Sequence, residues 1–148
     1  PVAVNRWGVY AKKGFAATIG RVEDMRTFRV GGVTNDAKLD YLAMYAVTGI
    51  RSVERDVLNP PRLLLPKDDP NRIDLWITST YTARRTAREA GVADIKPVFI
   101  AREVPLYIAC NPATPRPLVK AMSDALAAMK KDGTLKKITA DYERRFDR

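Results

Sequence analysis

The chain contains 148 residues, of which 46% are hydrophobic and 29% are charged, as in an ordinary globular domain. This composition excludes a disordered chain, a collagen helix and a coiled coil. With 26 Lys and Arg against 17 Asp and Glu, the formal net charge is +9. A single cysteine, Cys110, and the lack of histidine exclude an internal disulfide, a zinc site built from Cys and His, and catalysis by a histidine base. We expect neither a metal nor a cofactor.

The first half of the chain alternates predicted strands with helical segments. Strands are predicted at 6–13, 28–33 and 52–58, and short helical turns at 22–25 and 62–65. A longer helix is predicted after Asn35, because apolar residues recur at helical spacing. Gly49 is expected to end this helix as a C-cap residue in the left-handed conformation. Asn35 or Asp36 can act as its N-cap.

The second half continues the alternation. A strand covered on both faces is predicted at 73–78, a helix at 81–90, and two strands at 96–101 and 104–110. Two amphipathic helices follow, one that begins at Pro115 and one that is capped by Thr134. Thr114 is the expected N-cap of the first of these helices. Four strand aromatics and the cysteine are predicted to be buried, namely Trp7, Tyr10, Trp76, Tyr107 and Cys110. Strands that alternate with helices predict an α/β fold with a largely parallel sheet.

Two loops at predicted strand ends are candidates for ligand binding, because free backbone N–H groups and a helix dipole favour polar or anionic groups there. The first loop contains Thr34, Asn35, Asp36, Ala37 and Lys38. The second contains Thr78, Ser79 and Thr80. A purely structural role is the competing interpretation, in which Asp36 and Thr80 only cap helices. Neither loop has the glycine pattern of a nucleotide-binding loop, and Gly31-Gly32 lies within a predicted strand.

The excess positive charge does not predict a nucleic-acid partner. The basic pairs fall on exposed helix faces, where acidic residues interrupt them, and the chain has no helix-turn-helix or RNA-binding aromatic motif. Carboxylate pairs such as Asp68-Asp69 lie in loops without an apolar setting, so they give no sign of acid–base catalysis. The chain contains no stretch of about 20 apolar residues, the length that crosses a membrane.

Two segments resemble a known family. The sequence NRIDLW at 71–76 resembles the "GRID" strand entry, and MKKDGTLKKI at 129–138 resembles the "DGTLxKI" segment, of the bacterial periplasmic solute-binding proteins of family 3. These proteins serve ABC transporters for polar amino acids and related solutes. The resemblance implies a periplasmic-binding-protein-like α/β fold of type II, with two lobes that close on a ligand. It also implies export to the periplasm after removal of a signal peptide, and a membrane permease as partner.

The resemblance further implies how the lobes are divided. Residues 10–102 would form the second lobe, while 1–9 and 103–148 would carry the hinge strands and a remnant of the first lobe. Most of the first lobe would be missing, which makes the chain a fragment or one partner of an assembly in which a second chain completes that lobe. The apolar stripe of the helix from Pro115 is then expected to be covered by another chain or exposed.

The expected function is solute binding without catalysis, at the residues of the two loops. The family's acidic residue that binds an α-ammonium would fall at Ser79, and a neutral hydroxyl there disfavours a standard amino acid. An organic acid or another polar solute becomes an alternative, and Lys38 would suit an anion. Two other functions remain open: a dehydratase on the same scaffold, and the ligand-sensing domain of a signalling protein or transcription regulator.

Overall fold

The computed structural model describes residues 1–146. Its strands are β1 (Ala3–Lys12), β2 (Val30–Val33), β3 (Ile50–Val53), β4 (Leu75–Ser79) and β5 (Ile95–Leu106). Its helices are η1 (Val22–Thr27), α1 (Ala37–Met44), η2 (Asp56–Leu58), α2 (Asn59–Arg62), α3 (Ala83–Glu89), α4 (Arg116–Lys131) and α5 (Thr134–Phe146), where η marks a 3-10 helix. No described helix is both long enough and apolar enough to cross a membrane.

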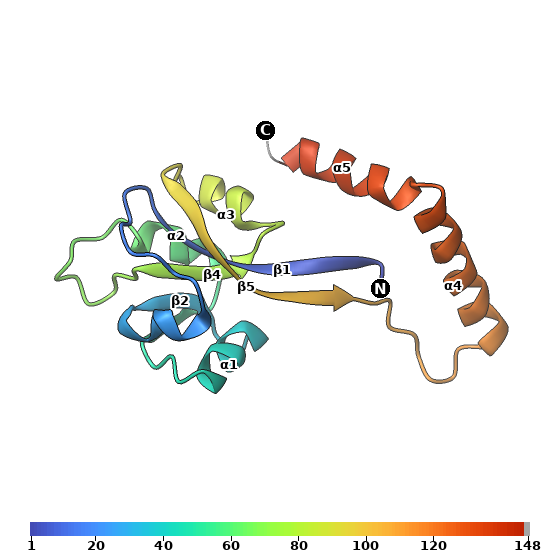
Figure 1. The fold of residues 1–148 in the computed structure, drawn as a ribbon, viewed down its shortest axis with the longest axis horizontal. Coiled ribbons are helices and arrows are strands. Elements are labelled where there is room, and N and C mark those ends of the chain that lie inside the picture. Colours follow the sequence, from blue (N-terminus) through green and yellow to red (C-terminus); the bar gives the residue numbers. More distant parts are fainter. Residues whose placement is uncertain (147–148) are drawn as a thin grey trace. The chain divides into compact units, whose positions relative to one another are not determined.

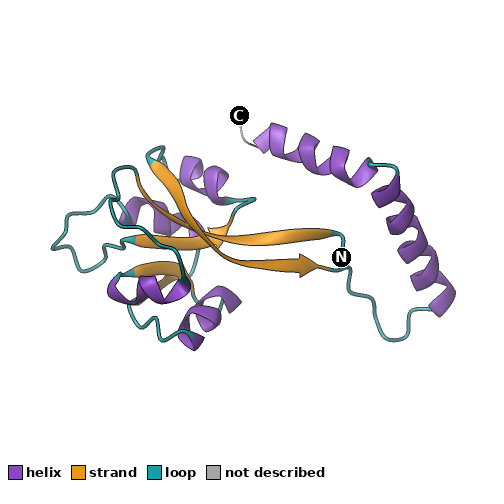
Figure 2. Ribbon diagram, in the orientation of Figure 1, coloured by secondary structure: helices purple, strands orange, loops and turns teal. Residues whose placement is uncertain are grey.

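The strands form one mixed sheet in the order β3-β2-β4-β1-β5. Figure 2 shows strands in orange and the helices around them in purple. Strand β2 runs parallel to both β3 and β4, as expected for strands joined through helices. Strand β1 is antiparallel to β4, with Trp7 opposite Ser79 and Tyr10 opposite Trp76. The predicted α/β class is therefore confirmed, with a parallel centre and an antiparallel β1.

Both faces of β4 are buried, because side chains that alternate along this strand enter two separate cores. Leu75 and Ile77 pack in a first core with Leu42 of α1 and Met25 of η1. Trp76 packs in a second core with residues of α3. Figure 1 shows α1 and α3 on opposite sides of the strands. The prediction of a strand covered on both faces is confirmed at β4.

The chain divides into two compact units. The larger unit is 5–104 and contains most of the sheet, together with the helices and loops that connect its strands. The smaller unit combines 1–4 with 105–148 and contains α4 and α5. In the smaller unit, apolar side chains of both helices are exposed: Leu118, Met122, Ile138 and Tyr142. The assignment of 10–102 to one lobe of a binding protein, and of 1–9 with 103–148 to the other, stays a prediction.

Several local predictions are wrong in the first half of the chain. Gly49 is not the left-handed residue after α1, since Ala46 has that conformation with φ 57°. Gly49 is instead required by crowding, because a Cβ there would lie 2.4 Å from the carbonyl oxygen of Phe28. The strand predicted at 52–58 ends at Val53, and η2 follows because Asp56 turns inward to bind side chains of β4.

The second half of the chain requires similar corrections. The strands predicted at 96–101 and 104–110 are one strand, β5, which ends at Leu106. Tyr107 and Cys110 lie beyond that end and are exposed, not buried. Helix α4 begins one residue later than predicted, with Pro115 at the N-cap position and no side-chain cap from Thr114.

Candidate functional site

The two loops predicted to bind ligand open at one edge of the sheet. Because β2 and β4 are parallel neighbours, the loop that leads into α1 and the end of β4 at Ser79 lie at the same edge. The antiparallel β1 brings Trp7 to this edge, directly opposite Ser79. All these residues belong to the larger unit, so the sheet itself fixes their arrangement.

The loop before α1 has the conformation that its sequence predicts. Asn35 is left-handed, with φ 61°. Asp36 is the N-cap of α1, and its carboxylate accepts a 2.9 Å hydrogen bond from the backbone N–H of Lys38. The same carboxylate accepts from the Lys38 ammonium at 2.9 Å. The hydroxyl of Thr34 donates to the carbonyl of Val53 on β3. The predicted N-cap at Asp36 is therefore confirmed, and its role in ligand binding stays a prediction.

Loss of this cap has a measurable cost. We expect Asp36→Ala to lower the free energy of unfolding by about 1 kcal/mol, because α1 loses the acceptor for one of its free N–H groups. Urea denaturation followed by circular dichroism measures the change. Asp36→Asn keeps a capping oxygen but loses the ion pair with Lys38, and should stay within about 0.5 kcal/mol of the wild type. Equal losses in both variants would contradict the capping role.

The three hydroxyls at the end of β4 differ in their environments. The Thr78 hydroxyl is buried and donates to the Asp56 carboxylate at 2.5 Å, so it supports the site from the second core. The Ser79 hydroxyl donates to the side-chain oxygen of Asn5 at 2.6 Å. Thr80 is half-buried, and its methyl group lies near Gly8. Thr80 does not cap α3, whose N-cap position is Thr82.

A cluster of aromatic and basic side chains joins the two loops, and sequence reasoning did not assign it to the site. The ring of Trp7 meets the ring of Tyr41 from α1 edge-on, with centroids 5.7 Å apart. The Lys38 ammonium and the Arg102 guanidinium each lie 5.6 Å from the centre of the Trp7 ring. Arg102 comes from β5, and no motif marks it in the sequence.

Tyr41 holds this cluster to the sheet. Its hydroxyl donates to the backbone carbonyl of Ala101 at 3.0 Å. Burial raises the pKa of Tyr41 above its ordinary value of 10.0, although the charge of Arg102 acts in the opposite direction. The hydroxyl therefore stays protonated at neutral pH and remains a donor to β5.

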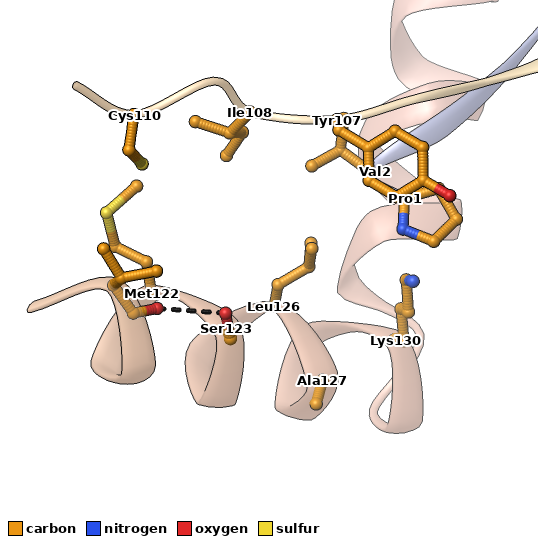
Figure 3. A pocket seen from close by; sticks show the side chains of 11 residues that line it. Pro1, Val2, Tyr107, Ile108, Cys110, Met122, Ser123, Leu126, Ala127 and Lys130 are labelled. Atoms are coloured by element: carbon orange, nitrogen blue, oxygen red, sulfur yellow. Dashed lines mark hydrogen bonds between the residues drawn. The ribbon is translucent and has the colours of Figure 1, made fainter. Parts of the chain in front are cut away.

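A pocket of about 310 Å³ lies in the smaller unit, between the segment after β5 and helix α4 (Figure 3). Figure 3 shows Cys110 and Met122 pointing toward one another across it. Its lining is mainly apolar, with Ser123 and Lys130 as polar members. No predicted ligand-binding residue lines this pocket, and its apolar lining does not suit a polar solute.

A scan against protein-family models and a search of curated proteins found no match. Solved structures do match. A binding component of an ABC transporter from Wolinella succinogenes, complexed with lysine, is 16% identical with a TM-score of 0.72, over 99% of this chain and 60% of that chain. An ancestral arginine-binding protein bound to glutamine is 23% identical with a TM-score of 0.69, over 96% of this chain and 61% of that chain.

A further match is a histidine kinase sensor domain with similarity to periplasmic binding proteins. It is 16% identical with a TM-score of 0.65, over 94% of this chain and 59% of that chain. This chain therefore spans about three fifths of the length of the structures described. At these identities the likeness establishes the fold, and the expected periplasmic-binding-protein-like α/β fold is confirmed. The chain has the fold of the solute-binding proteins of amino-acid ABC transporters, over part of their length.

Proposed function

We propose that this chain is part of an extracytoplasmic solute-binding protein that delivers a small polar solute to the membrane permease of an ABC transporter. The observation that carries the proposal is the convergence on Trp7 of the loop before α1 and the end of β4, in a fold shared with such proteins. The matching structures are described as solute-binding proteins and a sensor domain, which supports binding without catalysis.

The proposed site lies at the sheet edge of the larger unit. Its first side is the loop before α1, which consists of Thr34, Asn35, Asp36, Ala37 and Lys38. The backbone N–H groups of Thr34, Asp36 and Lys38 already donate within the protein, so a solute would meet chiefly the polar side chains of this loop. Its second side is Ser79 and Thr80, with Thr78 as a buried support. In this proposal α4 and α5 would belong to the first lobe of such a protein. The exposed apolar side chains of these helices fit the same proposal, in which a second chain completes that lobe.

A thermal-shift screen of the complete protein encoded by the gene tests this function. The panel contains amino acids, organic acids and polyamines, with sodium chloride at matched ionic strength as control. A solute at 100 times its dissociation constant should stabilise the folded protein by about 2.7 kcal/mol, because it binds only the folded state. The absence of any stabilisation at concentrations well above micromolar would count against solute binding.

A ligand-sensing domain is the second candidate, and the match to a histidine kinase sensor domain favours it. Both candidates bind a solute in the same fold, so the binding screen does not separate them. The neighbouring sequence of the gene does. A kinase segment or a membrane anchor on the same polypeptide would indicate a sensor, whereas an adjacent permease gene would indicate transport.

A further inference from the structure

Arg102 differs from the other cations at the proposed site in its bonding. The Lys38 ammonium is paired with the Asp36 carboxylate at 2.9 Å. Arg6 is paired with Glu103 at 2.7 Å. Within the part of the chain that the structure describes, Arg102 makes no hydrogen bond and no ion pair, and its side chain is exposed. The site therefore carries one positive charge that no neighbouring carboxylate neutralises.

Aromatic contacts hold this guanidinium in place. Its central carbon lies 5.0 Å from the centre of the Tyr41 ring and 5.6 Å from that of Trp7. The two rings are inclined at 73° to each other, so Arg102 occupies the corner that they form. The hydrogen bond from Tyr41 to Ala101, the residue before Arg102, fixes this corner to β5. Contacts of this kind leave the N–H donors of the guanidinium available, because rings accept no conventional hydrogen bond.

We propose that Arg102 binds a carboxylate group of the solute, so that the site selects carboxylate-bearing solutes over their neutral amides. This inference rests on the proposed function and specifies its solute class. A guanidinium binds a carboxylate through two parallel N–H···O bonds, and a guanidinium already stacked on rings loses little freedom when it does so. Ser79 at the same edge is neutral and already donates to Asn5. The uncompensated charge at this edge is therefore positive.

Three acids and their amides provide matched probes: acetate and acetamide, succinate and succinamide, lactate and lactamide. Affinities are measured by isothermal titration on the complete protein and on its Arg102→Ala, Arg102→Lys and Arg88→Ala variants. Arg88→Ala is the charge-matched control, because Arg88 is exposed on α3 and lies outside the proposed site. Circular dichroism confirms that each variant is folded.

We expect at least one acid to bind more tightly than its amide. Arg102→Ala should lower the affinity for that acid about 10- to 100-fold, because a charged hydrogen-bond partner is lost. The affinity for the amide should not change. Arg102→Lys should retain part of the preference, and Arg88→Ala all of it. An acid that binds Arg102→Ala as tightly as the wild type overturns the inference and leaves the proposed function standing. So does a protein that binds only solutes without a carboxylate group from the wider panel. A protein that binds no solute overturns both.

Discussion

Asp56→Ala is expected to lower the free energy of unfolding by about 3–5 kcal/mol, since it leaves buried donors without an acceptor. The Asp56 carboxylate accepts from the indole N–H of Trp76 at 2.8 Å and from the hydroxyl of Thr78 at 2.5 Å. Trp76 is fully buried and Thr78 is 3% exposed, so water does not replace the lost acceptor. Asn59, also buried, donates to the same carboxylate at 3.3 Å. Urea denaturation measures the change.

The matched control is Asp68→Ala. Asp68 is exposed in the loop before β4, so its removal should change the free energy of unfolding by less than about 0.5 kcal/mol. Asp56→Asn retains one acceptor oxygen and should fall between the two alanine variants. If Asp56→Ala is no less stable than Asp68→Ala, the carboxylate does not hold the end of β4. Thr78 would then give no structural support to the proposed site.

Gly49→Ala is expected to destabilise the protein by about 3 kcal/mol, the upper part of the range for overpacked sites. The added Cβ would lie 2.4 Å from the carbonyl oxygen of Phe28, and a backbone atom cannot rotate away as a side chain can. The contact is fixed on both sides, because the carbonyl of Gly49 accepts a hydrogen bond from the N–H of Val30 at the start of β2. Relief of the clash would separate β2 from the segment that leads into β3.

Gly20→Ala is the control for this prediction. A Cβ at Gly20 would lie 3.7 Å from the Asp24 carboxylate, which is an ordinary contact. Both substitutions add the same methyl group and reduce the freedom of the unfolded chain equally. Gly20→Ala should therefore be neutral or slightly stabilising in a thermal melt. Similar melting temperatures for both variants would show that the backbone near Gly49 moves apart without cost.

Regular patterns in the sequence predict most of the fold. The continuous apolar run of β4 predicts burial on both faces, and the structure confirms it at Leu75 on one face and Trp76 on the other. Predictions are wrong where a distant contact decides the local structure. Asp56 ends the third strand early because its carboxylate binds β4, and Gly49 is required by the backbone at Phe28. Neither contact leaves a signal in the residues around the position itself.

The candidate site could be predicted only in part. Asn35, Asp36 and Ser79 follow predicted strands, so sequence order alone brings them to a sheet edge, and the structure places them there. Trp7 and Arg102 come from the two ends of the larger unit. Only the antiparallel pairing of β1 with β4, and the position of β5 beside β1, brings them to the same edge. Pairing of this kind depends on the complete sheet and not on local periodicity.

The place of β1 in the sheet also sets the order in which the larger unit can fold. The first strand of the chain is an interior strand between β4 and β5, and Arg6 meets a partner, Glu103, that lies 97 residues away. Closing so long a loop costs chain entropy before any contact compensates for it. We expect the parallel strands β2, β3 and β4, joined by shorter segments, to assemble first. During synthesis, β1 is then made before β2, β3 and β4 but enters the sheet after them.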